Sequence, residues 1–391
     1  MRTSTRVLSV TALWVGSFGA LRISLLAPEG CPDVTPAALE ASAVAAGAWI
    51  ERGQGDDGRY VYEYHRDDDR VVSAGYNIVR HAGVTMSLYQ LARAGHPEVV
   101  GTADKALAMM LDNVVPAGDG IAFVDSDTSA RLGASALMAA ALAQRRDATG
   151  DDRYDEDLRA LGRFLVGQIT TGGQMLNLYD LRTAAPSPGQ TSRYSTGEAA
   201  WALAQLHNFF PDEGWDVPAR HVLDYLATSR DEVEALDFAP WPDQWAAYTL
   251  AELAPWGLDD HHVRYAEALS ERFGMLVRYE SQKDGWPLPF IDPRARGAGL
   301  GVWVEGLGAL ARAADSDDRL ADVRTALDDR MVCGASLLAE RQPDRREAAA
   351  WDAPTLVEGA WFRYDVTRMD DQQHALSGLL AAAGELGPVG P

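Results

Sequence analysis

Four carboxyl groups lie at or near the start of apolar helical segments, where a fold can gather them at one site. Glu198 opens the run EAAWALAQL, and Glu305 interrupts the run LGVWVEGLGALA. A carboxylate in such surroundings is costly to bury, and enzymes use groups of this kind as general acids or bases. Asp243 and Asp370 open two further helical segments. Because glycoside hydrolysis takes two carboxyl groups across a sugar-binding cleft, these residues predict that chemistry.

Each of these carboxyl groups also has a structural interpretation. Ser195 followed three residues later by Glu198 has the spacing of a capping box, in which both side chains accept N–H groups at a helix start. Asp243 suits the N-cap of its own helix. Glu305 suits a buried ion pair with an arginine such as Arg80. The residues leave both interpretations open for each group.

A histidine lies close to the last acidic pair. Asp370 and Asp371 precede His374 by four and three residues, a spacing that places a carboxylate and the imidazole on one helix face. This group predicts an oriented base, or alternatively a structural cluster at a helix start. Arg80 and His81 are adjacent, so only one of them should point into a shared interior. Arg80 would there bind a carboxylate or sulfate of a substrate, or else pair with an acid of the protein.

Aromatic side chains are numerous enough to form a sugar-binding surface, although core packing is the ordinary role of each. Trp241 and Trp286 each adjoin a proline in a loop, which favours them as cleft residues. The full set of candidates is Tyr60, Tyr62, Tyr179, Tyr194, Trp241, Trp245, Trp286, Trp303 and Trp361.

The elements that must position these residues form a recurring pattern. Ala- and Leu-rich helices are expected at 77–94, 129–147, 195–209, 242–254, 298–314 and 370–385, and each is accompanied by a more amphipathic helix. The spacing of the six is too irregular for a solenoid of equal repeats. It predicts an all-α (α/α)6 toroid of helical hairpins, with short β-hairpin inserts near 60–64 and 120–124 and at the centre of 172–188. We expect residues 36–391 to form this single domain.

Several motifs on the expected inner helices resemble those of a known group of folds. RHAG at 80–83, YSTGEA at 194–199, DQW at 243–245, VEG at 304–306 and DDQQHAL at 370–376 are similar to the inner-helix signatures of bacterial (α/α)6-barrel proteins of the six-hairpin glycosidase-like and epimerase-like type. LYDL at 178–181, followed by Tyr194, resembles a stretch of glucuronyl C5-epimerases, in which tyrosines transfer protons. The resemblance implies the barrel architecture and a carbohydrate substrate.

The N-terminal residues 1–35 have the pattern of a signal peptide or membrane anchor with a linker. Arg2 and Arg6 precede an apolar run at 7–21, which Arg22 interrupts and residues 23–27 resume. A helix buried in the body is the alternative. Orientation by the positive charges would place the body outside the cytoplasm, either secreted or anchored. Cys31 and Cys333 are too few for a disulfide scaffold, but they can form one bridge.

Composition excludes other classes of function. A net charge of −22 argues against nucleic acid, whose phosphates require a basic surface. We expect no cofactor and no metal, since two cysteines cannot build a paired Cys/His zinc site, and His261, His262 and the run 67–69 are interpreted as solvated surface. The DSDT run at 125–128 is similar to the acidic motif of class II terpene cyclases but lacks its last Asp.

The sequence therefore predicts an extracytoplasmic glycan-processing enzyme, with glycoside hydrolysis as the leading reaction. Uronic-acid C5-epimerisation and polysaccharide lysis are the first alternatives. A barrel that binds a glycan or an envelope partner without catalysis is another, and it predicts carboxyl groups in an ordinary environment. A terpene-cyclase-like enzyme is the remaining one, and it predicts a deep apolar bore with Asp127 at its end.

Overall fold

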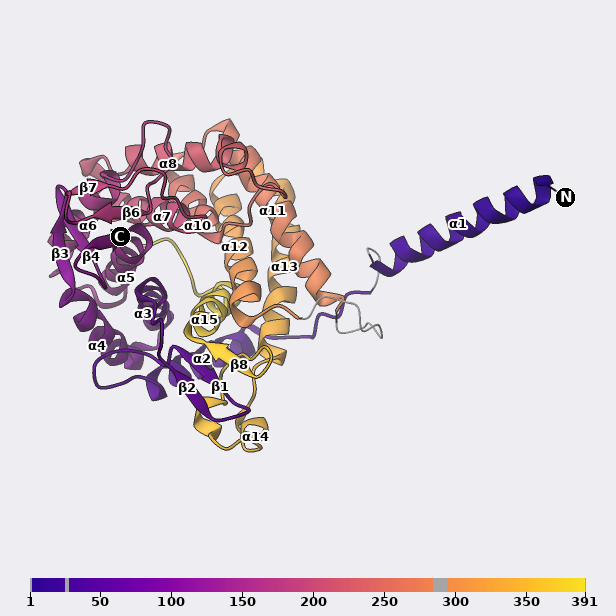
Figure 1. The fold of residues 1–391 in the computed structure, drawn as a ribbon, viewed down its shortest axis with the longest axis horizontal. Coiled ribbons are helices and arrows are strands. Elements are labelled where there is room, and N and C mark those ends of the chain that lie inside the picture. Colours follow the sequence, from indigo (N-terminus) through magenta and orange to yellow (C-terminus); the bar gives the residue numbers. More distant parts are fainter. Residues whose placement is uncertain (1, 25–27, 284–293, 391) are drawn as a thin grey trace.

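Six helices stand side by side in a closed inner ring (Figure 1). The computed structural model describes residues 2–24, 28–283 and 294–390. The inner helices are α3 (Ile78–Arg93), α5 (Leu132–Thr149), α7 (Ser195–Phe209), α10 (Gln244–Leu253), α12 (Gly297–Ser316) and α15 (Met369–Ala383). Each contacts the next, and α15 closes the ring against α3. Their sides are buried almost all round, which explains why Ala, Gly and Leu replace the usual polar stripe.

A second layer of helices surrounds this ring and buries its outer side. The outer helices are α2 (Pro36–Arg52), α4 (Val100–Leu111), α6 (Asp155–Val166), α8 (Asp216–Thr228), α11 (Asp260–Ser281) and α13 (Ala321–Glu340). The helix α6 shows the outer pattern, with three acidic residues in its first turn, as the helix dipole favours, and Leu and Phe on the buried face. The predicted (α/α)6 toroid of helical hairpins is confirmed.

Small residues set how closely the inner helices approach. A Cβ atom on Gly301 of α12 would lie 2.3 Å from the backbone carbonyl carbon of His374 in α15. Backbone cannot move aside as a flexible side chain can, so only glycine fits there. The contact holds the α15 segment that carries His374 directly against α12, the helix that carries Glu305.

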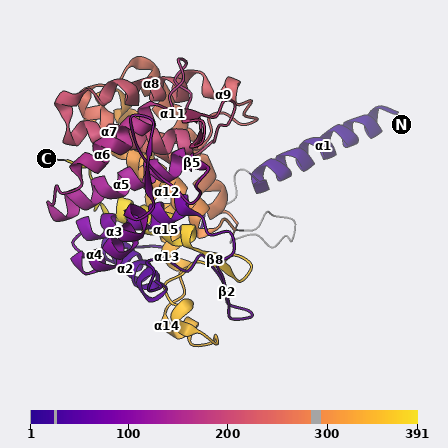
Figure 2. The same cartoon turned by 60° about the vertical axis from the view of Figure 1, so that its left-hand side comes forward.

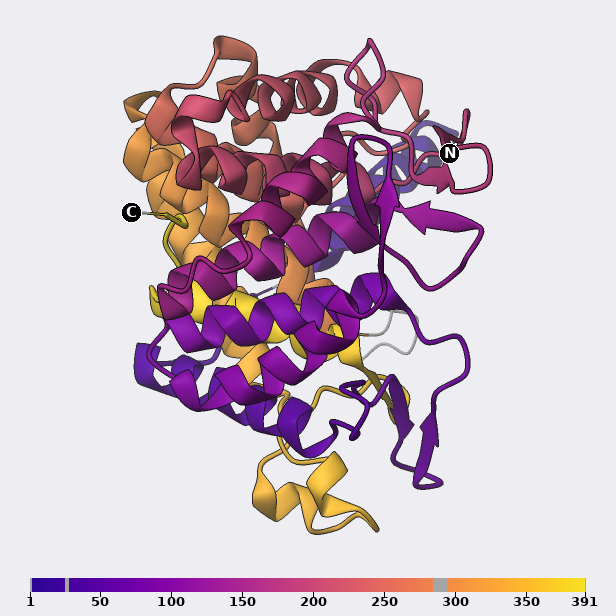
Figure 3. The same cartoon turned by 90° about the vertical axis from the view of Figure 1, so that its left-hand side faces the viewer.

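Short strands gather at one end of the barrel, whereas the chain ends near the opposite end (Figures 2 and 3). The strands β1 (Glu63–His65), β2 (Arg70–Val72) and β8 (Val366–Arg368) form an antiparallel sheet in the order β2-β1-β8, with Tyr64 opposite Thr367. The hairpin β3 (Val114–Ala117) and β4 (Gly120–Phe123) is separate. A third sheet joins β5 (Ser129–Arg131), β6 (Leu178–Asp180) and β7 (Ala185–Pro186). These sheets realise the predicted inserts.

The remaining elements are short connections between the hairpins. Two are single-turn helices, α9 (Arg230–Val233) and α14 (Arg345–Ala348). The others are 3-10 turns at Pro97–Val99, Pro211–Glu213, Ala254–Trp256, Asp318–Leu320 and Pro354–Leu356.

The N-terminal helix α1 (Arg2–Ser24) projects away from the barrel (Figure 1). Leu13, Trp14 and Phe18 are exposed, so the alternative of a helix buried in the body is wrong. Within the described ranges, no helix combines the length and apolarity that a membrane crossing needs. Cys31, which follows α1, forms a disulfide with Cys333 of α13 and ties the start of the domain to a late outer helix.

Candidate active site

A cavity of about 730 Å³ opens where the N-termini of the inner helices converge. The N-cap residues of α3, α5, α7, α12 and α15 all line it, and Pro242 and Gln244 represent the start of α10. Those five N-cap residues are Asn77, Arg131, Tyr194, Arg296 and Arg368. Because the parallel inner helices all begin at one end, residues from all six helix starts come together at this site.

Glu198 lies in the first turn of α7 and lines the cavity, although its side chain is only 5% exposed. Its Oε2 atom is buried and has no hydrogen-bond partner among the described residues. Burial, and secondarily the negative charge of Asp243, raises the pKa of Glu198 to about 8, against the opposing charge of His374. Glu198 is therefore a neutral carboxylic acid at pH 7, able to donate a proton.

A glycine makes room for this carboxyl group. A Cβ atom on Gly133 of α5 would lie 2.3 Å from Glu198 Oε2 and 2.9 Å from Ser195 Oγ. The predicted capping box of Ser195 and Glu198 is wrong, because α7 begins at Ser195 itself, one residue earlier than that motif requires, and its N-cap is Tyr194. The Ser195 hydroxyl instead donates to Asn177 Oδ1 at 2.9 Å. Glu198 is thereby left to face the cavity.

His374 of α15 and Glu305 of α12 form a hydrogen-bonded pair. Nδ1 of His374 lies 2.7 Å from Glu305 Oε2, and the Tyr248 hydroxyl donates to Glu305 Oε1 at 3.2 Å. Burial alone would lower the pKa of His374, but the contact with Glu305 outweighs it and raises that pKa. Burial raises the pKa of Glu305. The pair therefore retains a proton to higher pH than an isolated histidine does.

This pairing differs from the one expected on a single helix. The partner of His374 is Glu305, 69 residues away, rather than Asp370 or Asp371. Glu305 itself is fully buried, does not line the cavity, and reaches it only through His374, which does line it. The alternative of an ion pair between Glu305 and Arg80 is wrong.

Asp243 has the structural role that its sequence position allows. Its carboxylate accepts the backbone N–H groups of Trp245 and Ala246 as the N-cap of α10. Its other oxygen lies 2.5 Å from Arg230 Nη1, and both side chains are about 1% exposed. Asp243 does not line the cavity, so its predicted catalytic role has no support in the geometry.

Asp370 does line the cavity and is held by two arginines. Its Oδ2 atom lies 3.5 Å from Arg80 Nε and 3.2 Å from Arg368 Nη2, whereas its Oδ1 atom is buried without a partner in the described part of the chain. Arg80 also donates to the Tyr62 hydroxyl at 2.8 Å. The neighbouring Asp371 is turned away and binds Arg296. Asp370 therefore lines the cavity as a carboxyl group that contacts two arginines through one oxygen.

The aromatic candidates divide into two groups. Tyr194, Trp241, Trp245 and Trp303 line the cavity. Trp245 is buried, with its ring centroid 5.9 Å from that of His374, while Tyr194 is exposed and meets Trp241 edge to face. The predicted Trp241 is thus a wall residue. The predicted Trp286 lies outside the described residues.

The other predicted binding residues serve elsewhere. His81 is buried between Tyr76 and Ala106, and burial lowers its pKa to about 4, so it is a neutral core histidine. Tyr60 is buried against Thr85. Tyr62 reaches the site only through Arg80. Tyr179 and Trp361 do not line this cavity but two neighbouring ones. His81 and Tyr60 are therefore core residues, and their predicted binding role is not supported by the geometry.

Four arginines of the cavity wall were not among the predicted site residues: Arg131, Arg296, Arg363 and Arg368. Three of them are N-cap residues of inner helices. An N-cap arginine is unusual, because helix starts favour acidic or small polar residues. That anomaly was the available signal in the sequence.

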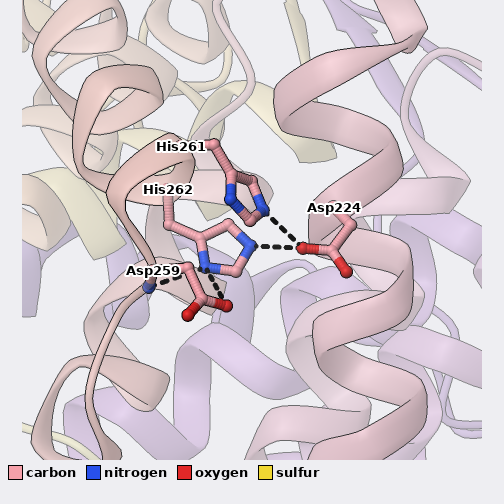
Figure 4. A group of neighbouring side chains, drawn as sticks. All are labelled: Asp224, Asp259, His261 and His262. Carbon is pink, nitrogen blue, oxygen red and sulfur yellow. Dashed lines mark hydrogen bonds and ion pairs between the residues drawn. The ribbon is translucent and has the colours of Figure 1, made fainter.

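His261 and His262 were expected to be solvated, but His262 is fully buried. Figure 4 shows both imidazoles turned toward Asp224. Both Nε2 atoms meet Oδ1 of Asp224 on α8, at 2.6 and 2.8 Å. Nδ1 of His262 accepts the backbone N–H of Asp259, the N-cap residue of α11. The group therefore hydrogen-bonds one outer helix to the next and caps α11.

The acidic run at 125–128 does not support a cyclase. Asp127 is exposed and does not line the cavity, whose wall carries five arginines beside its apolar residues. A class II cyclase site would require this aspartate at the end of an apolar bore.

No protein-family model matches the chain, and no curated protein matches its sequence. Solved structures do match its fold. An unsaturated glucuronyl hydrolase specific for heparin has a TM-score of 0.60 at 12% identity, covering 89% of this chain and 97% of its own. The chain therefore has an (α/α)6-barrel fold, which it shares with these structures.

Two further structures show how varied the proteins of this shape are. A sugar epimerase from a ruminal bacterium has a TM-score of 0.58 at 12% identity, over 89% of this chain and 99% of its own. The GH76A α-1,6-mannanase from Salegentibacter sp. HEL1_6 has the same TM-score and identity, over 89% and 100%. At such identity the likeness extends to the fold, so the chemistry must be argued from the site.

Proposed function

We propose that this protein is a glycan-processing enzyme that cleaves a glycosidic bond, with Glu198 as the proton donor. The supporting observation is the environment of Glu198, a buried carboxyl group with a pKa of about 8 and an unpartnered oxygen in the cavity wall. An alkoxide leaves a sugar with difficulty, and a neutral carboxylic acid at this place protonates it as the bond breaks.

Asp370 is the second carboxyl group of the proposed reaction. It faces the same cavity, and its ion pairs with Arg80 and Arg368 stabilise its negative charge. Two carboxyl groups in opposite protonation states are what glycoside hydrolysis requires, one to donate a proton and one to activate water or stabilise the cationic sugar. Trp241, Trp245 and Trp303 supply surfaces on which sugar rings stack.

Epimerisation of a sugar is the second candidate, and His374 favours it. Its Nδ1 is bound to Glu305, so the rest of the ring is oriented while the residue lines the cavity with Glu198. Two proton-exchanging groups at one cavity suit removal of a proton from carbon and its return on the other face. The resemblance of LYDL to C5-epimerases agrees with this reaction, but Tyr179 lies outside this cavity.

A barrel without catalysis is disfavoured by the same geometry. Such a protein has no need of a buried carboxyl group that lines the cavity with an oxygen lacking a partner among the described residues, and its carboxyl groups would be paired as Asp243 is.

We also propose that the protein works outside the cytoplasm. The disulfide between Cys31 and Cys333 suits an oxidising compartment, and the basic and apolar residues at the N-terminus suit export. Fractionation of the cells that make it, with thiol alkylation of the isolated protein, tests this. A cytoplasmic protein with two free thiols would contradict it.

The reaction is tested by incubating the protein with neutral and uronate-containing oligosaccharides in D2O and measuring the masses of the products by mass spectrometry. Hydrolysis splits the chain with the gain of one water. Epimerisation leaves the chain length unchanged and introduces deuterium at carbon. Glu198→Gln should abolish either reaction. Turnover by this variant at the wild-type rate would sink the assignment of Glu198.

A further inference from the structure

The cavity wall is rich in positive charge, although the chain as a whole carries a net charge of −22. Its carboxyl groups are Glu198 and Asp370, and Glu198 is neutral at pH 7 because of its raised pKa. Its arginines are Arg80, Arg131, Arg296, Arg363 and Arg368. An acidic protein that concentrates guanidinium groups at one cavity creates a local field for anions.

Carboxylates of the protein neutralise only part of this charge. Arg296 has a partner of its own in Asp371, at 2.7 Å. Arg80 and Arg368, by contrast, share the single carboxylate of Asp370. The group of Arg80, Arg368 and Asp370 therefore carries one positive charge in excess.

Arg131 and Arg363 have no such partner. Neither forms an ion pair with a carboxylate within 4 Å in the described ranges 2–24, 28–283 and 294–390. Nε of Arg363 is buried and makes no hydrogen bond with a described residue. A buried donor without an acceptor costs free energy, which a bound anion would recover.

The helix geometry adds to this field. Arg131 is the N-cap of α5, where the helix dipole already presents partial positive charge. Arginine there opposes the local electrostatics, and no described carboxylate offsets it. A local rule broken in this way without compensation is typical of a functional site.

The cavity also continues beyond the proposed catalytic residues. A neighbouring cavity of about 560 Å³ shares Ala295, Arg296 and Arg363 with it, and Trp361 and Phe362 also line this second cavity. The shared arginines stand at the junction between the two. The combined space suits a chain of several sugars rather than a monosaccharide.

We propose that this end of the barrel binds an anionic oligosaccharide, whose carboxylate or sulfate groups pair with Arg131 and Arg363. The proposal names the substrate class of the proposed function and rests on it. Guanidinium forks bind both kinds of anion with two parallel hydrogen bonds.

Calorimetric titration of the Glu198→Gln variant tests the proposal without any turnover. The probes are a trigalacturonate, a sulfated oligosaccharide without uronate, and neutral α-1,6-mannotriose. At least one anionic probe should bind about tenfold or more tightly than mannotriose, and its affinity should fall as salt is added. The tighter of the two anionic probes identifies the carboxylate or the sulfate. Equal or tighter binding of mannotriose would overturn the proposal.

Substitutions identify the arginines responsible. Arg131→Gln and Arg363→Gln, added singly to the same variant, should each weaken the anionic probe about tenfold and leave mannotriose unchanged. Arg264→Gln is the matched control, since Arg264 is an exposed arginine of α11 that lines neither cavity. Unchanged affinity in both test variants would refute the assignment.

The two proposals fail separately. An anionic preference without any turnover by the wild-type protein leaves the binding inference standing and removes the enzyme assignment. Turnover of neutral glycans without any preference for anionic probes supports the enzyme assignment and removes the binding inference.

Discussion

The starts of two neighbouring inner helices, α7 and α10, use a buried carboxyl group in opposite ways. Asp243 at α10 accepts two backbone N–H groups and binds Arg230, so all of its charge is matched. Glu198 at α7 is equally buried, yet its Oε2 atom has no partner among the described residues, and it faces the cavity. Burial is therefore common to both. The partners decide which group is part of the framework and which can exchange a proton.

The close contact between the starts of α7 and α10 also affects the site. A Cβ atom on Gly197 would lie 2.7 Å from both carboxylate oxygens of Asp243, so glycine lets the α10 cap approach α7. The charge of Asp243 then helps to keep Glu198 protonated. The structural carboxylate thus tunes the neighbouring one.

The largest effect is expected from Glu198→Gln. This change keeps the size of the side chain and removes its proton donor, so kcat/KM should fall about 10²- to 10⁴-fold, the usual contribution of a general acid. The melting temperature should not fall, because no ion pair is lost. Steady-state kinetics and calorimetry measure the two effects. A comparable loss of stability would place Glu198 with Asp243 in the framework.

Asp243→Asn should affect stability more than activity. Asparagine still caps α10, but the buried Arg230 loses its closest counter-charge and retains Glu234, 3.5 Å from its Nε atom, so the unfolding free energy should fall by about 1–3 kcal/mol. Urea denaturation measures this. Activity per folded molecule should fall less than in Glu198→Gln. If activity disappears while stability is unchanged, Asp243 belongs to the catalytic machinery after all.

The pH dependence of stability should also separate the two sites. Glu198 ionises near pH 4.5 when unfolded and near 8 when folded, so the folded state holds the extra proton between these values. Wild-type stability therefore declines with rising pH over this window, and Glu198→Gln removes that decline. The unfolding free energy of the variant, relative to that of the wild type, should therefore rise by at most a few kcal/mol between about pH 5 and 8. A constant difference across this range would contradict the raised pKa.

The pH profile of activity follows from the same shift. A general acid must be protonated, so kcat/KM should fall as the pH rises through about 8. Glu305→Gln removes the charge that raises the pKa of His374. If the titration of His374 contributes to the pH profile of kcat/KM, that part of the profile should then move to lower pH. An unchanged profile in this variant would exclude His374 from catalysis.

A smaller effect is expected from Gly133→Ala. The new methyl group would displace the flexible Glu198 carboxyl group, so kcat/KM should fall about tenfold while stability changes little. Gly101→Ala is the matched control, because Gly101 is also the second residue of its helix, α4, and its added Cβ meets nothing within 4 Å. An equal response of the two variants would show that Gly133 does not position Glu198.

The sequence predicted elements better than it predicted neighbours. Inner and outer helices lie where apolar periodicity placed them, and Asp243 caps α10 because a cap is a local interaction over three residues. The capping box at Ser195 failed by a single residue in the helix start. His81, Tyr60 and Asp243 looked equally suited to the site, since residue type alone does not tell whether a side chain faces the core, a neighbouring element or the cavity.

The sequence by itself determined the ring of six helical hairpins, because amphipathic and Ala-rich segments have few other ways to bury their surfaces. It also placed Glu198 and Asp370 in the first turns of inner helices, where they line the cavity. Tertiary structure alone decided their chemistry. Glu305 meets His374 across 69 residues, Gly133 makes room for Glu198, and Asp243 is neutralised by Arg230 of another element. A pKa depends on charges and burial within a few ångströms, and these come from segments that are distant in the chain.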